Sequence, residues 1–119
     1  MKHADRLLCH LSELPDGGSR GLVRQGFDDL LCVVRQGQVV RAWLNDCPHE
    51  HRPLEYRRDQ FLSADGTHIV CYAHSAHFDL HTGECFAGPC LGQCLTPVPV
   101  RLDAQGRLWV PDPLPTVFD

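Results

Sequence analysis

The feature that most constrains this chain is a pair of short segments, each of which supplies one cysteine and one histidine. The first segment reads Cys47-Pro48-His49, and the second, which follows residues 50–70, reads Cys71-Tyr72-Ala73-His74. Together they offer two thiolates and two imidazoles. These donors suit a [2Fe–2S] cluster in which two histidines replace two cysteines on one iron. They also suit a zinc ion with two sulfur and two nitrogen ligands.

The spacing of the four donors favours the two-iron cluster. Structural zinc sites usually place two to four residues between paired ligands, and they commonly group cysteines together and histidines together. Here Pro48 alone separates Cys47 from His49, and each segment mixes the two ligand types. Mixed pairs suit two irons, because each segment can give its cysteine to one iron and its histidine to the other. Zinc stays open as the alternative.

Length, charge and hydropathy exclude several classes of protein. The chain has 119 residues, which predicts one domain over residues 1–119 with a small core that a metal centre would help to stabilise. The formal net charge is −4 and no basic patch stands out, so nucleic acid is not an expected partner. No apolar run is long enough for a signal peptide or a membrane span, which predicts a cytoplasmic protein.

The seven cysteines fit a reducing compartment, since an odd number cannot all pair in disulfides. Cys85, Cys90 and Cys94 are loosely spaced, and no histidine or fourth cysteine completes a metal site with them. We interpret them as packing thiols. We interpret His51 as a surface residue of the loop, not as a spare ligand, and the sequence leaves the role of His77 open.

Strand and turn signals dominate the rest of the chain. Two runs rich in β-branched residues, 30–35 and 38–44, flank a glycine-containing turn and predict a hairpin. Residues 67–72 predict a later strand, and the second donor segment begins at its end. Pro97 and Pro99 exclude helix and suit a strand at the edge of a sheet.

No segment carries a sustained 3.6-residue apolar period, so we expect an all-β fold, an antiparallel sandwich or barrel. The donor segments fall between an early hairpin and a late one, which suggests a small metal-binding subdomain inserted over about residues 45–92. The prolines at 111, 113 and 115 predict an irregular tail.

The residues around the donors resemble the Rieske iron–sulfur family, whose pattern is Cys-x-His followed by Cys-x-x-His. Beyond the donors, the likeness rests on Phe78-Asp79-Leu80, Thr82-Gly83 and Gly88-Pro89. It covers about residues 30–110. The resemblance implies a Rieske-like β-sandwich with an inserted cluster-binding subdomain and one [2Fe–2S] cluster per chain. It also implies that Cys47 and Cys71 bind one iron, and that His49 and His74 bind the other.

Departures from the family pattern point to a low-potential, disulfide-lacking member. Ser75 stands where most members have glycine. High-potential members carry an extra cysteine in each donor segment, and this chain has none at those places. They also place hydroxyl groups near the cluster sulfurs, whereas the matching positions here are Ala76 and Phe78. Fewer hydrogen bonds to the sulfurs lower the reduction potential.

The resemblance implies an electron carrier and not an enzyme. Rieske oxygenases bind a further iron on a separate, larger domain, for which residues 75–119 leave no room. We therefore expect a soluble Rieske-type ferredoxin that passes single electrons from a flavin reductase to a terminal oxygenase. One alternative is the small subunit of an assimilatory nitrite reductase. A zinc-stabilised interaction module without a redox role is an alternative of another class.

Overall fold

The computed structural model describes residues 4–25, 28–48, 53–54, 59–72 and 75–114. Within them the regular elements are antiparallel β-strands and one short 3₁₀ helix, which confirms the predicted all-β class. The strands are β1 (Ala4–His10), β2 (Ser19–Gln25), β3 (Asp28–Gln36), β4 (Val39–Leu44), β5 (Ile69–Cys71), β6 (Ala76–Phe78), β7 (Cys85–Ala87), β8 (Pro97–Val98), β9 (Arg101–Leu102) and β10 (Arg107–Asp112); the helix is η1 (Leu11–Glu13). None of the described helices is long and apolar enough to cross a lipid bilayer.

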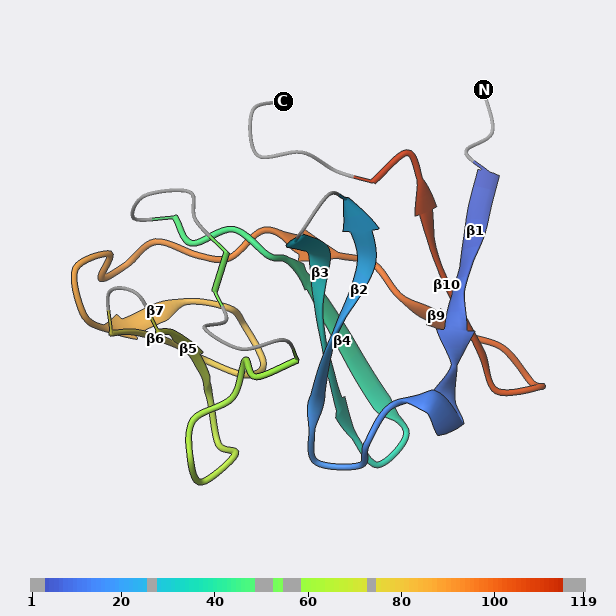
Figure 1. The fold of residues 1–119 in the computed structure, drawn as a ribbon, viewed down its shortest axis with the longest axis horizontal. Helices are drawn as coiled ribbons and strands as arrows, with labels where there is room; N and C mark the ends of the chain where they lie inside the picture. The colour runs from blue at the N-terminus through green and yellow to red at the C-terminus, as the bar shows by residue number, and fades with distance from the viewer. Residues whose placement is uncertain (1–3, 26–27, 49–52, 55–58, 73–74, 115–119) are drawn as a thin grey trace.

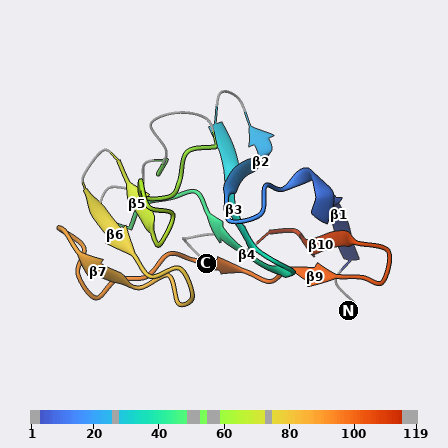
Figure 2. The same ribbon diagram turned by 90° about the horizontal axis from the view of Figure 1, so that it is seen from below.

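The strands form three sheets with the orders β2-β3-β4-β8, β1-β10-β9 and β5-β6-β7. Figures 1 and 2 both show the β5-β6-β7 sheet at one end of the molecule, apart from the other two sheets. This small sheet comes from residues 69–87, which lie inside the span of about 45–92 that we expect to carry the metal.

The β3–β4 hairpin separates two buried cores and packs one of its faces into each. Its turn contains Gly37 at φ +63°, a left-handed conformation that glycine adopts without steric cost. Because side chains alternate between the two faces of a strand, Cys32 and Trp43 enter the core beside the small sheet. Leu31 and Ala42 face the other way, into the core that β1, β8 and β10 help to close. The predicted hairpin is therefore confirmed.

Two prolines lie within strands. Pro97 pairs with Trp43 in β8, the edge strand of its sheet, as predicted. The expectation of an irregular tail was wrong for Pro111, which lies in β10 opposite Asp5. In the described part of the chain β9 pairs only with Leu108 and Trp109 of β10, so the missing N–H of Pro111 interrupts no pairing on that side.

Candidate metal centre

The two predicted cysteine ligands lie in one buried core. Cys47 follows the end of β4, and Cys71 is the last residue of β5. Both thiols are 0% exposed and belong to the core cluster that also contains Cys85 and Cys90. The two predicted imidazole ligands, His49 and His74, lie outside the described residues. The structure thus brings the two thiols into one core, and the imidazole assignments stay a prediction.

Asn45 closes the segment that contains Cys47. Its backbone N–H donates to the carbonyl of Leu30 at 2.8 Å, and its Nδ2 donates to the carbonyl of Asp29 at 2.9 Å. Its Oδ1 accepts from the backbone N–H of Leu54 at 2.7 Å. The buried amide of Asn45 therefore connects the chain just before Cys47 with Leu54 and anchors it to β3.

A backbone hydrogen bond connects the two donor segments. The N–H of Tyr72 donates to the carbonyl of Leu54 at 3.0 Å, immediately after Cys71. Leu54 is fully buried, and it accepts this bond while its own N–H is held by Asn45. Leu54 therefore joins the two donor segments. Its N–H is bonded to Asn45, just before Cys47, and its carbonyl is bonded to Tyr72, just after Cys71.

The second donor segment begins with a tight turn. The N–H of Ser75 donates to the carbonyl of Cys71 at 2.8 Å, and Ser75 has φ +56°. This left-handed conformation explains why glycine suits the position, and it costs a serine some backbone strain. The chain then enters β6, which the sequence analysis did not predict. β5 is also shorter than the predicted strand over residues 67–72.

The loop after β7 packs directly on this turn. Gly88 has φ +104°, and a Cβ at this position would lie 2.8 Å from both the Cα of Ala76 and the carbonyl oxygen of Ser75. Such a distance leaves no room for any side chain at residue 88. The Gly88 loop therefore covers the chain at Ser75 and Ala76, directly after the second donor segment.

The Phe78-Asp79-Leu80 motif ends β6 in an ordered turn. The carboxylate of Asp79 accepts from the backbone N–H groups of His81 at 2.7 Å and Thr82 at 2.9 Å. These bonds, that of Thr82 first, lower the pKa of Asp79 below its ordinary value. Phe78 and Leu80 point into the core with Cys47 and Cys71.

Two further thiols lie near the predicted ligands. The Sγ of Cys90 donates to the Sγ of Cys85 at 3.2 Å, and both residues are buried. Burial, the bond to Cys85 and the nearby thiols of Cys85, Cys47 and Cys71 together raise the pKa of Cys90 to about 12. The interpretation as packing thiols agrees with this burial for Cys85 and Cys90, whereas Cys94 is exposed.

His77, whose role the sequence left open, lies on β6 away from the thiols' core. Its Nδ1 is 2.7 Å from Nε2 of His68, and both rings lie near the half-exposed ring of Phe86.

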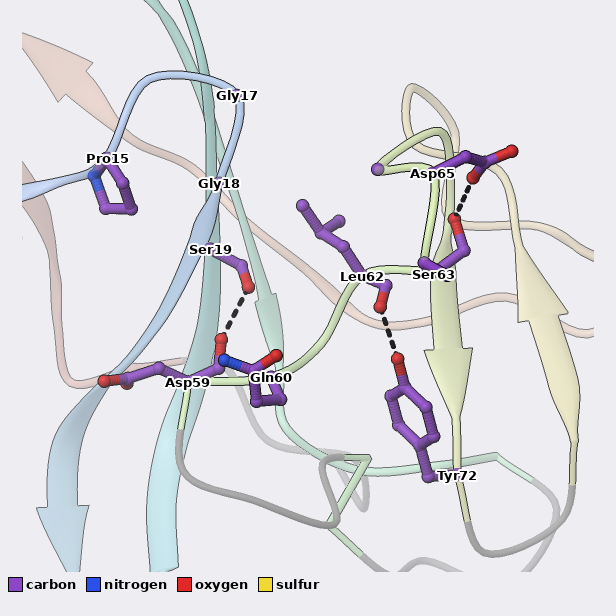
Figure 3. A pocket seen from close by; sticks show the side chains of 12 residues that line it. Pro15, Gly17, Gly18, Ser19, Asp59, Gln60, Leu62, Ser63, Asp65 and Tyr72 are labelled. Atoms are coloured by element: carbon purple, nitrogen blue, oxygen red, sulfur yellow. Dashed lines mark hydrogen bonds between the residues drawn. The ribbon is translucent and has the colours of Figure 1, made fainter.

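A separate polar hollow lies between the β1–β2 connection and residues 59–66, where Tyr72 donates to the carbonyl of Leu62 (Figure 3). Among the described residues that line this hollow there is no cysteine.

Comparison with known proteins decides between the two kinds of metal centre. The family model of the Rieske [2Fe-2S] domain matches residues 5–106. The chain belongs to this Rieske family. A search of curated proteins gave no match.

Solved structures extend this result. The ferredoxin of carbazole 1,9a-dioxygenase from Nocardioides aromaticivorans IC177 is 26% identical, with a TM-score of 0.66 over 90% of this chain and 96% of that chain. A ferredoxin from Sphingomonas yanoikuyae B1 is 26% identical, with a TM-score of 0.65 over 91% and 96%. The terminal oxygenase of carbazole 1,9a-dioxygenase from N. aromaticivorans IC177 is 21% identical over 89% of this chain but 29% of that chain, with a TM-score of 0.68, and shares the fold.

The donor chemistry of this Rieske domain fits a [2Fe–2S] cluster. Cys47 and Cys71 are buried thiols, the soft donor type that such a cluster takes, on two segments that one hydrogen-bond network connects. Within the described residues, no group of three or more histidine, cysteine or acidic side chains is placed to hold a metal ion. His49 and His74, the imidazole ligands that the family motif predicts, lie outside the described residues, so their assignment stays a prediction.

Proposed function

We propose that this Rieske protein is a ferredoxin that carries single electrons from a flavin-containing reductase to a terminal oxygenase in the cytoplasm. One cluster per chain would be held by Cys47, His49, Cys71 and His74, and the cluster would supply one-electron chemistry. The protein itself would bind the cluster, keep water from its sulfurs and present it to partners. It would transform no substrate.

The observation that carries this proposal is the extent of the likeness to ferredoxins. The chain covers 96% of each of the two ferredoxins named above, but 29% of the terminal oxygenase. One of the similar structures is described as a complex of reduced oxygenase and oxidized ferredoxin in carbazole 1,9a-dioxygenase, at 26% identity. A partner of the oxygenase class is therefore the one that these relatives support best.

The buried thiols support the same role. A carrier has to hold its cluster in one geometry through both redox states, because movement of the ligands would slow electron transfer. Asn45, Leu54 and Tyr72 provide such a frame, since their hydrogen bonds of 2.7 to 3.0 Å link the two donor segments. The loop at Gly88 adds a cover over the second segment.

The ligand assignment is tested by purifying the protein anaerobically and measuring iron, acid-labile sulfide and the EPR spectrum after reduction. We expect the iron and sulfide of one cluster per chain, and the loss of both in His49→Ala and His74→Ala. His51→Ala is the matched control, because it removes an imidazole from the same segment and should keep the cluster. A colourless zinc-containing protein would overturn the proposal, as would a cluster that survives loss of both His49 and His74.

The carrier role needs its own test. A flavoprotein reductase with NADH should reduce the purified protein, and the reduced protein should then donate its electron to a terminal oxygenase with substrate turnover. Stable copurification with a siroheme reductase, and no transfer to an oxygenase, would support the nitrite reductase subunit instead.

A further inference from the structure

Cys85 and Cys90 stand at the two ends of the loop that carries Gly88 and Pro89. Their Sγ atoms are 3.2 Å apart, and the residues are 1% and 3% exposed. A disulfide bond is about 2.05 Å long, so the two sulfurs have to approach by only about 1 Å to form one.

Backbone hydrogen bonds hold the two cysteines in this position. The N–H of Cys85 donates to the carbonyl of Gln93 at 2.7 Å, and the N–H of Gly92 donates to the carbonyl of Cys85 at 3.1 Å. The N–H of Gln93 donates to the carbonyl of Cys90 at 2.9 Å. These three bonds close the loop at its base, where the two thiols meet.

The same loop packs against Ser75 and Ala76, which directly follow the second donor segment. The backbone of Gly88 lies against Ser75 and Ala76 so closely that a Cβ would be 2.8 Å from them. In Figure 2 the chain after β7 turns back beside β6 and β7 before it returns toward β8. A covalent bond between Cys85 and Cys90 would therefore close the base of the segment that covers the candidate centre.

We propose that Cys85 and Cys90 form a thiol–disulfide site that a small peroxide oxidises and a dithiol reductant restores, and that the disulfide fastens the Gly88 loop over the second donor segment. The burial of both thiols favours an oxidant as small as hydrogen peroxide. Cys94, which is exposed, is the thiol that bulkier reagents reach.

The oxidation balances with hydrogen peroxide as the co-reactant. One thiol loses its proton, and the resulting thiolate attacks an oxygen of the peroxide. The O–O bond breaks, the departing hydroxide takes up the proton as one water, and a sulfenic acid forms. The second thiol attacks the sulfenic sulfur and displaces its oxygen as a second water, while the S–S bond forms. The two thiols lose two electrons and two protons, and the peroxide takes up both to become two waters.

The first test maps the disulfide in the full-length, cluster-loaded protein. The protein is treated anaerobically with stoichiometric hydrogen peroxide, denatured in acid, alkylated and digested with chymotrypsin, which cleaves after Phe86 between the two cysteines. We expect two peptides joined through Cys85 and Cys90, which separate on reduction. Alkylation of both cysteines after peroxide treatment would overturn the proposal, and so would a bond from Cys90 to Cys94 or to Cys47.

Matched variants sharpen this test. Cys94→Ser removes the exposed thiol and should leave the Cys85–Cys90 link intact. Cys85→Ser and Cys90→Ser should each abolish it. Because the peptide map reads the sulfurs directly, it gives an answer whether or not the cluster assignment is correct.

The second test asks whether the disulfide fastens the loop. Loss of visible absorbance to an iron chelator should be several-fold slower in the oxidised protein than in the reduced protein. A dithiol reductant should reverse the difference, and Cys85→Ser should lack it. Equal rates in the oxidised and reduced forms would overturn the fastening role.

Discussion

Asn45 shows, at the scale of a single residue, how one amide can shape a ligand segment. It is 9% exposed and forms hydrogen bonds with Asp29, Leu30 and Leu54 at the same time. A buried backbone group that loses its partner costs the protein about 1–3 kcal/mol, since water cannot replace the bond. The segment with Cys47 therefore depends on a side chain that binds no metal.

We expect Asn45→Ala to lower the free energy of unfolding by about 2–4 kcal/mol, because it leaves the N–H of Leu54 and the carbonyl of Asp29 without this partner. Chemical denaturation followed by circular dichroism measures the change. Asn45→Asp should also be destabilised, since its carboxylate still accepts from Leu54 but sets an oxygen against the carbonyl of Asp29 and cannot donate to it. An Asn45→Ala protein as stable as the original would contradict the role of this amide.

Sequence patterns were sufficient for some of these residues and not for others. Cys47 and Cys71 stand in a spaced motif with distinctive chemistry, and the structure places both in the buried core. The requirement for a left-handed residue at Ser75 was also visible, because the family has glycine there. The role of Asn45 was not predicted, since its bonds to Asp29 and Leu54 span 16 and 9 residues and leave no local pattern.

At the scale of elements, the β3–β4 hairpin could be predicted from the sequence, whereas the small sheet could not be predicted in full. A hairpin has local pairing, alternating apolar residues and a glycine turn, and all three are visible in sequence. β6 has three residues, and it exists because Ile69, Val70 and Cys71 pair with it across the turn at Ser75. So short a strand has no periodicity to detect, and it is found only through its partners.

The loop at Gly88 is an element whose glycines can be compared directly. Gly88 and Gly92 both have positive φ, but a Cβ at Gly92 would meet nothing within 4 Å. We expect Gly88→Ala to lower the free energy of unfolding by about 1–3 kcal/mol more than Gly92→Ala does, because only the first change adds overpacking to the backbone cost. Cluster loss to a chelator should be faster in Gly88→Ala alone. Equal effects of the two variants would contradict the close packing of the loop on Ser75.

The Asp79 turn predicts how stability changes with acid. Its pKa is lowered from the ordinary 3.8, so its contribution is fully present above about pH 4 and is lost as pH falls through the folded value. Asn at this position still accepts from His81 and Thr82 but carries no charge. We expect the denaturant midpoint of Asp79→Asn to decline less than that of the original protein below pH 4. Parallel declines would show that the carboxylate adds no acid-dependent stability.

At the scale of the whole molecule, the chain is divided into two buried cores by one hairpin. One face of β3–β4 packs with Leu108 and Val110 in a core without metal ligands, and the other face packs around the thiols. The subdomain over about residues 45–92 stays a prediction, because the core around the thiols also includes Cys32, Trp43 and Leu95 from outside that span.

The metal-side core also predicts the reduction potential. Ala76 and Phe78 are 0% exposed in the cluster of residues that contains Cys47 and Cys71, and neither has a hydroxyl to donate. Hydrogen bonds to the cluster sulfurs stabilise the added electron, so their absence lowers the potential. We expect a value near the lower end of the range of about −150 to +300 mV found for such centres.

Protein-film voltammetry of the cluster-loaded protein measures this potential directly. Phe78→Tyr adds one hydroxyl to a buried ring beside the thiols, and we expect it to raise the potential, because the new donor would favour the reduced state. Leu80→Met, a change of shape without a donor in the same core, is the matched control and should leave the potential nearly unchanged. A potential above about +100 mV in the original protein would contradict the link between these apolar positions and low potential, since it would require donors that Ala76 and Phe78 do not supply.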